Sequence, residues 1–340
     1  MSSPSTSTLL RHAHRRQQRA YALRLGALLL AVIALWWLNV LVGEKTYSFA
    51  QAFAVLRGET VPGASFTLGE LRLPRATIGA AAGVAFGVSG VIFQRLLRNQ
   101  LASPEIIGIS SASAASGVTA IIGFHASQSA VSAAALAAGL GLSALVYVLS
   151  LKSGFSGTRL ILIGIGFSAL LQAWINLMLT AAPSWDLPTA TRWITGSLNS
   201  LTWQRGAPLL GAVVLLAPVA ALLSARLSLL QLGDELPVSL GVRLPLVRVG
   251  LILCAVGLIS VATSVTGPIA FLAFMSGPIA ARLFPLGSAL ILPSAAVGAA
   301  LVLGADFAGQ YLLGHQYPVG VVTGALGAPF LINLLTRINR

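Results

Sequence analysis

Charged residues are scarce in this chain of 340 residues. They make up 9% of the sequence, whereas an ordinary soluble domain carries about a quarter. Hydrophobic residues make up 56%. Apolar stretches of roughly 17 to 25 residues, each long enough to cross a bilayer as a helix, recur from Ala22 to Leu335. The composition excludes a water-soluble globule and predicts an all-α membrane protein.

The chain has a single cysteine, and it lacks nucleotide-binding loops and metal-ligand patterns. Cys254 is the only cysteine and lies in an apolar stretch, which excludes a disulfide framework and favours a small packing residue. No glycine-rich loop is followed by Lys and Ser or Thr, and the histidines form no His-Glu-x-x-His pattern. We expect no catalytic residue, metal or cofactor in this chain. A membrane enzyme is disfavoured, and any ATP hydrolysis must belong to a partner.

Acidic residues are few, so the net charge is +13. The basic residues lie in short loops between apolar stretches, without interleaved aromatic residues, which argues against a nucleic-acid partner. The Arg-rich N-terminus superficially resembles a signal peptide. However, the apolar stretch from Ala27 to Val42 is too long and no clear cleavage site follows it, which favours a retained first span.

The apolar stretches predict about ten membrane spans in one domain, residues 22–340, after a basic tail, residues 1–21. The expected spans are 22–43, 74–96, 107–125, 129–150, 159–182, 206–227, 248–267, 268–284, 288–311 and 319–336. The eighth is the weakest, because Gly267-Pro268 and Gly277-Pro278 would kink or break a helix. A bent or re-entrant helix is the alternative there.

Basic residues divide unequally between the two sides of these spans. Six of the 21 Lys and Arg fall on the side away from the termini, namely Lys45, Arg57, Arg72, Arg75, Arg192 and Arg205. By the positive-inside rule, both termini are expected to be cytoplasmic.

Few polar residues fall inside the spans. Asp306 is the only acidic residue placed in one, and it has no evident basic partner in the membrane; it is either a hydrogen-bonded structural group near the outer face or a functional site such as a proton relay. Gln172 and Asn176 share one face of the fifth span, with Met178 nearby. They could line a pathway or make interhelical hydrogen bonds.

Small residues and one tryptophan also stand out. Gly79, Gly83 and Gly87 recur every four residues in the second span, a pattern typical of closely packed helices. The outer segments Tyr47 to Leu56 and Ala190 to Leu201 have amphipathic character. Trp193, in the second of them, is expected to anchor at headgroup depth or to contact substrate.

The segment between the sixth and seventh spans carries acidic residues on the otherwise basic cytoplasmic side. Asp234 and Glu235 could cap a helix, or they could belong to a short helix presented to a soluble partner. Composition leaves both interpretations open.

Several motifs together resemble those of one family. They are Arg72-Leu73-Pro74-Arg75, Ser89-Gly90-Val91-Ile92-Phe93-Gln94, Arg98-Asn99-Gln100-Leu101-Ala102-Ser103-Pro104 with Ile107-Gly108, Leu232-Gly233-Asp234 with Leu240-Gly241-Val242, Gly267-Pro268-Ile269-Ala270-Phe271, and Tyr317-Pro318-Val319-Gly320-Val321-Val322-Thr323 with Gly327-Ala328-Pro329-Phe330. In order and spacing they resemble FecCD-type permeases of bacterial ATP-binding-cassette (ABC) importers for iron-siderophore and cobalamin.

The resemblance implies a type II ABC importer permease fold with ten spans in the bacterial cytoplasmic membrane. The partners it implies are a second permease subunit, two ATPase subunits that bind ATP and Mg, and an extracytoplasmic siderophore-binding protein. It also implies that a cytoplasmic loop at about 229–247 couples the permease to the ATPases. The coupling residues would be Leu232, Gly233, Asp234, Glu235, Leu240 and Gly241.

The resemblance further implies that Arg72 and Arg75 dock the binding protein, unless they are merely span-end anchors. A third family arginine is replaced by Gln310, and a family histidine is absent from Gly277-Pro278-Ile279-Ala280-Ala281-Arg282. These departures, with Thr191-Arg192-Trp193-Ile194-Thr195-Gly196-Ser197-Leu198, are more similar to the second permease of ferric-catecholate systems than to a homodimeric cobalamin permease. We therefore expect a heterodimer.

The function that the sequence favours is ATP-driven import of a ferric siderophore. Within the same family, cobalamin or haem import is the alternative. An ion-coupled secondary transporter that uses Asp306 is the alternative of another class.

Overall fold

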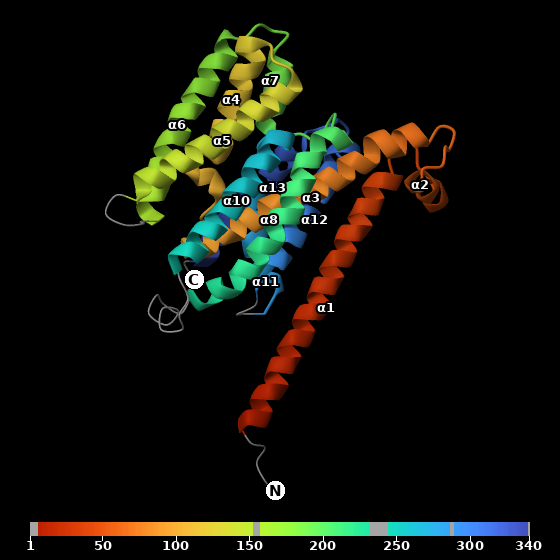
Figure 1. The fold of residues 1–340 in the computed structure, drawn as a ribbon. Coiled ribbons are helices and arrows are strands. Elements are labelled where there is room, and N and C mark those ends of the chain that lie inside the picture. Colours follow the sequence, from red (N-terminus) through yellow and green to blue (C-terminus); the bar gives the residue numbers. More distant parts are fainter. Residues whose placement is uncertain (1–5, 152–156, 231–243, 286–288, 339–340) are drawn as a thin grey trace.

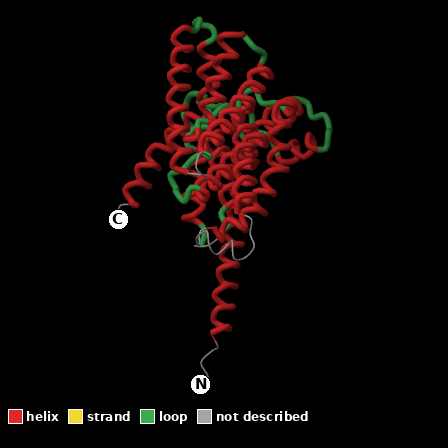
Figure 2. The backbone as a smooth tube through the Cα atoms, turned by 60° about the vertical axis from the view of Figure 1, so that its left-hand side comes forward, coloured by secondary structure: helices red, strands yellow, loops and turns green. Residues whose placement is uncertain are grey.

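The structure is a computed structural model that describes residues 6–151, 157–230, 244–285 and 289–338. Throughout these ranges the chain forms helices joined by loops, with no strand (Figure 2). The predicted all-α architecture is confirmed. The coupling residues between Leu232 and Gly241 lie outside the described ranges.

Fourteen helical elements follow one another along the described chain. They are α1 (Thr6–Leu41), α2 (Phe49–Leu56), the π-helical η1 (Phe66–Arg72), α3 (Leu73–Leu96), the 3-10 turn η2 (Pro104–Ile107), α4 (Ile109–Phe124), α5 (Gln128–Ser150), α6 (Gly157–Ala181), α7 (Leu187–Thr195), α8 (Trp203–Leu230), α10 (Leu244–Thr266), α11 (Leu272–Leu283), α12 (Ile291–Tyr311) and α13 (Val319–Ile338).

Ten of these helices correspond to the ten predicted spans. Within the described ranges, eight helices are long and apolar enough to cross a membrane, and α4 and α11 are shorter apolar helices. The eighth span, predicted as 268–284, is shorter than expected. Gly267 and Phe271 have φ angles of +74° and +60°, so the chain leaves α10, turns, and starts α11 only at Leu272. The expected break is therefore present at Gly267-Pro268, whereas α11 continues through Gly277-Pro278 as one helix.

Local sequence explains where several helices begin. Ser48 and Gln51 form a capping box at the start of α2, and Ser127 caps α5 through the Ala130 N–H. Pro74 lies at the start of α3, where the helix changes from π-helical to α-helical. The π-helical turn of η1 runs directly into α3, so this span starts earlier than the predicted residue 74.

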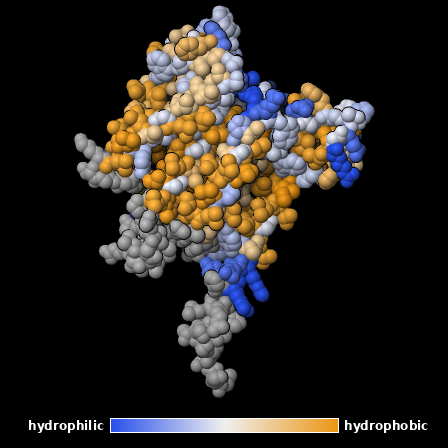
Figure 3. Space-filling model, viewed as in Figure 1, coloured by the Kyte–Doolittle hydropathy of each residue, from blue (hydrophilic) through white to orange (hydrophobic). Residues whose placement is uncertain are grey.

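The helix α3 forms the centre of the bundle and is covered by α8, α10, α11 and α12, while α4, α5, α6 and α7 form a second group beside it (Figure 1). Of the most apolar window of α3, 83% is buried, against 6% for α1, whose N-terminal end projects below the bundle (Figure 1). Apolar side chains cover the middle of the visible surface, and hydrophilic residues gather above and below it (Figure 3). This pattern is that of a bundle surrounded by hydrocarbon.

Candidate functional site

The N-terminal end of α3 carries an ion pair that links three segments. Arg75 donates to both carboxylate oxygens of Asp306, through Nε at 2.9 Å and Nη2 at 2.8 Å, and its Nη1 donates to Asn199 Oδ1 at 2.7 Å. Gln310 Nε2 donates to the same carboxylate at 2.8 Å. Asp306 is 2% exposed. The expectation that Asp306 lacks a basic partner is therefore wrong, because α3 and α12 place Arg75 beside it.

The side chain of Arg72 also makes hydrogen bonds within the chain. Its guanidinium donates to the backbone carbonyls of Val40, Leu41 and Lys45 at 2.8 to 3.2 Å, and it lies 5.1 Å from the centre of the Tyr47 ring. Arg72 and Arg75 both line a cavity of about 280 Å³ at this end of the bundle. Docking of a binding protein by these two arginines stays a prediction. Their contacts show that each already holds neighbouring segments together.

A second, smaller cavity adjoins the first, and Ser200 lines both. It measures about 110 Å³ and contains Arg192 of α7 and Arg205 of α8. Its described lining residues include neutral polar side chains but no carboxylate. The two cavities therefore differ in their acidic groups: Glu44 lines the first and Asp306 neutralises its Arg75, whereas no carboxylate lines the described part of the second.

Three helix ends meet beside this cavity. The Ser197 N–H donates to Thr266 O at 2.8 Å, and the Gly320 N–H donates to Gly196 O at 3.2 Å. A Cβ on Gly196 would collide with the backbone of Pro268, so this crossing requires glycine. The family-like motifs around residues 196, 267 and 320 thus form one junction of α7, α10 and α13.

Trp193 is not a headgroup anchor, because it is only 7% exposed. Its indole lies against Gly117 of α4, where a Cβ would overlap the ring. The glycine creates a slot that the sequence analysis did not foresee. Trp193 therefore packs α7 closely against α4.

The predicted pathway residues of α6 do not share one environment. Gln172 and Asn176 are exposed on the same helix face and bond to each other, Nε2 to Oδ1, at 3.3 Å. Met178 instead packs against the buried cluster formed by α4, α5 and α7. Only Gln172 and Asn176 are therefore available to a neighbour or a pathway.

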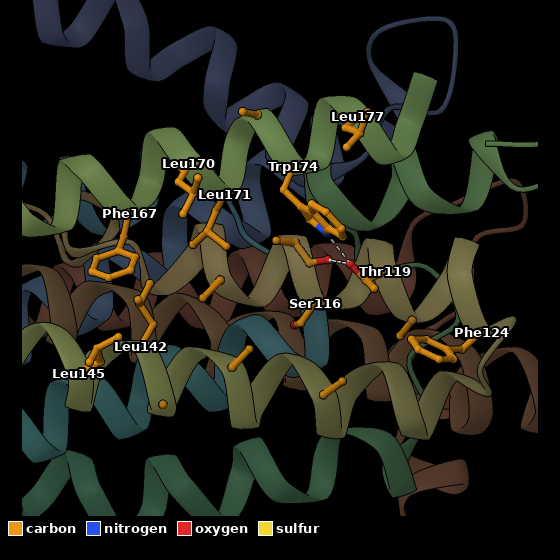
Figure 4. A pocket seen from close by; sticks show the side chains of 17 residues that line it. Ser116, Thr119, Phe124, Leu142, Leu145, Phe167, Leu170, Leu171, Trp174 and Leu177 are labelled. Carbon is orange, nitrogen blue, oxygen red and sulfur yellow. Dashed lines mark hydrogen bonds between the residues drawn. The ribbon is translucent and has the colours of Figure 1, made fainter. Parts of the chain in front are cut away.

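The other side of α6 faces an apolar groove of about 890 Å³ between α4, α5 and α6 (Figure 4). Phe167, Leu170 and Leu171 point into it, and Trp174 Nε1 donates to Thr119 Oγ1 across it at 2.9 Å (Figure 4). Its walls are hydrocarbon apart from a few polar groups. Such a surface suits apolar chains rather than a charged chelate.

Glu105 is a charged residue that the sequence analysis overlooked. It lies in η2, and its carboxylate accepts a hydrogen bond from the Phe271 N–H at the start of α11. Burial raises the pKa of Glu105 to about 7, although this hydrogen bond acts in the opposite direction.

The described residues contain no cluster of three His, Cys, Asp or Glu that could hold a metal ion.

Comparisons with known proteins agree with this architecture. Residues 28–337 match the profile of the FecCD transport family. The chain is 37% identical over 310 residues to the ferric enterobactin transport system permease protein FepG of Escherichia coli (strain K12), covering 91% of this chain and 93% of that protein. It is 36% identical over 322 residues to the achromobactin transport system permease protein CbrC of Dickeya dadantii (strain 3937), covering 92% and 91%. A solved structure, described as an inward-facing conformation of a metal-chelate type ABC transporter, superposes with a TM-score of 0.82 at 26% identity and covers 93% of this chain and 100% of that one.

Proposed function

Because this chain belongs to the FecCD transport family, we propose that it is the permease subunit of an ATP-driven importer that carries a ferric siderophore across the bacterial cytoplasmic membrane. The observation that carries the proposal is the match over nine-tenths of the chain to siderophore permeases. The bundle of apolar helices supports it, because such helices satisfy their own backbone hydrogen bonds in hydrocarbon.

The proposed assembly contains a second, non-identical permease subunit, two ATPases that hold ATP and Mg, and an extracytoplasmic siderophore-binding protein. Both termini of this chain would face the cytoplasm. Gln172 and Asn176 support a neighbour other than lipid on their side of α6, because exposed amides at membrane depth are costly in hydrocarbon. We therefore place the translocation pathway, and the second permease, on that side of α6.

Coupling to the ATPases is assigned to the loop that contains Asp234. Replacing Gly233 or Asp234 should leave membrane insertion intact and abolish uptake, because the loop would transmit closure of the ATPases to the spans. ATP hydrolysis by the assembled importer is the second measurement, and it should lose its stimulation by loaded binding protein. Normal uptake by both variants would remove the coupling assignment.

The function itself is tested by reconstituting this chain with a second permease and the ATPases in liposomes. Radioiron siderophore is offered on its binding protein, and ATP is supplied on the ATPase side. We expect uptake that requires ATP, the binding protein and the second permease. ATP-dependent uptake of cobalamin or haem instead would replace the cargo, and transport by this chain alone would overturn the proposal.

A further inference from the structure

The small cavity between α7 and α8 has a charge that its surroundings do not balance. Arg192 is exposed, and its guanidinium has no acceptor within the described chain. Arg205 donates one N–H to Ser200 O at 2.8 Å; no carboxylate lines the described cavity beside its remaining donors. The cavity next to it shows the contrast, because there Arg75 is neutralised by Asp306. Two guanidinium groups without a counter-charge in one recess attract an anion.

The dimensions and donors limit what that anion can be. At about 110 Å³ the cavity is smaller than the roughly 300 to 1,000 Å³ of sites that enclose a whole small molecule. It can hold one functional group of a larger ligand. Guanidinium forks match paired anionic oxygens, and the neutral lining residues Gln128, Thr189 and Asn199 offer further polar contacts.

The position of the cavity connects it with transport. The helix α7 follows α6 after the short segment 182–186, and the proposed pathway lies along the side of α6 that carries Gln172 and Asn176. The end of α7 is bonded to the end of α10 and the start of α13. An anion held here would therefore lie at the outer end of the pathway, where cargo enters.

We propose that Arg192 and Arg205 bind one anionic oxygen group, a carboxylate or a catecholate edge, of the ferric chelate as it leaves the binding protein. The inference rests on the proposed function, because it takes the cargo to be a ferric siderophore, and it narrows the cargo to chelates that carry negative charge. Contact through one group is weak enough for the cargo to be released inward.

Direct binding is tested on the full chain in nanodiscs of uncharged lipid, with citrate as the probe. An arginine-selective dicarbonyl reagent labels the protein, and mass spectrometry follows each arginine. At a citrate concentration twice the dissociation constant, labelling of Arg192 and Arg205 should slow about threefold by mass action, while Arg57, an exposed arginine outside the cavity, is unaffected. No protection, equal protection by sulfate at the same ionic strength, or protection by anionic lipid in place of citrate overturns the assignment.

Transport is tested with the double variant Arg192→Gln/Arg205→Gln in the reconstituted importer. Loss of two charge-assisted contacts should lower the maximal uptake rate about tenfold or more. The binding-protein concentration that gives half-maximal uptake should not change. The variant Arg192→Lys/Arg205→Lys, which keeps the charge, should recover part of the rate, and Arg57→Gln should equal the wild type.

Two outcomes of the transport test separate the possible failures. A higher half-maximal concentration of binding protein with an unchanged maximal rate would mean that the cavity docks that protein, and it would overturn the cargo assignment. If the wild-type importer shows no ATP-dependent uptake of ferric siderophore, the proposed function fails. The labelling experiment still decides whether the anion site exists.

Discussion

Replacing Arg75 with alanine is expected to destabilise the protein by about 3 to 5 kcal/mol, the cost of leaving one partner of a buried ion pair alone. The reason is Asp306, which is 2% exposed and would keep only Gln310 as a side-chain donor in the described structure. The measurement is the midpoint of thermal unfolding in detergent, followed by loss of the monodisperse peak in size-exclusion chromatography. Arg57→Ala, a change to an exposed arginine on the same predicted side, is the control and should have no effect.

A double variant separates a structural pair from a docking arginine. Arg75→Met/Asp306→Leu removes both charges and should recover most of the lost stability, because a buried pair is often replaceable by apolar residues of similar volume. If the arginine serves only to dock the binding protein, Arg75→Ala would retain full stability and reduce uptake alone. That result would contradict the structural role.

The variant Asp306→Asn decides between the two classes of transporter. The amide oxygen can still accept from Gln310 or Arg75, and Arg75 is 21% exposed and can reach water. ATP-dependent uptake should therefore survive in this variant. An ion-coupled carrier that used Asp306 as its relay would lose coupling instead.

Helix positions could be predicted from the sequence because hydropathy and capping are local. The fourth span, predicted as 129–150, is found as Gln128–Ser150. The break before α11 could be predicted from Gly267-Pro268 in the sequence. Burial of Trp193 could not be foreseen, because it depends on a slot in α4 that lies far away in the sequence. The hydrogen bond from Phe271 to Glu105 is of the same kind.

The partner of Asp306 could have been predicted in part, because the spacing of small residues along α3 contained information that the sequence analysis did not use. Antiparallel packing brings Gly79 against Val302, Gly83 against Gly298 and Gly87 against Ser294. Each step of four residues along α3 is matched by four residues back along α12. One more step outward pairs Arg75 with Asp306, which are 231 residues apart in the chain. The stripe of small residues gave the spacing, but only the fold identified α12 as the helix it meets.

The contact between Gly83 of α3 and Gly298 of α12 is the second place where a substitution should strongly lower the free energy of unfolding. A Cβ on Gly298 would collide with the Gly83 carbonyl oxygen, and a Cβ on Gly83 would collide with the backbone of Gly298 and Ala299. Backbone atoms cannot rotate away as a side chain can. Gly298→Leu should therefore cost about 3 kcal/mol or more, the upper range for overpacking.

The matched control for Gly298→Leu is Gly304→Leu on the same helix, because a Cβ on Gly304 would meet nothing within 4 Å. Both changes gain about the same helix propensity, roughly 0.8 kcal/mol, so the difference between their unfolding midpoints isolates the α3 to α12 contact. Gly298 lies eight residues before Asp306, as Arg75 lies eight before Gly83. Spreading the helices at the glycines should also separate the ion pair, so Arg75→Ala should destabilise Gly298→Leu less than it destabilises the wild type. Full additivity of the two changes would mean that the helix contact and the ion pair are independent.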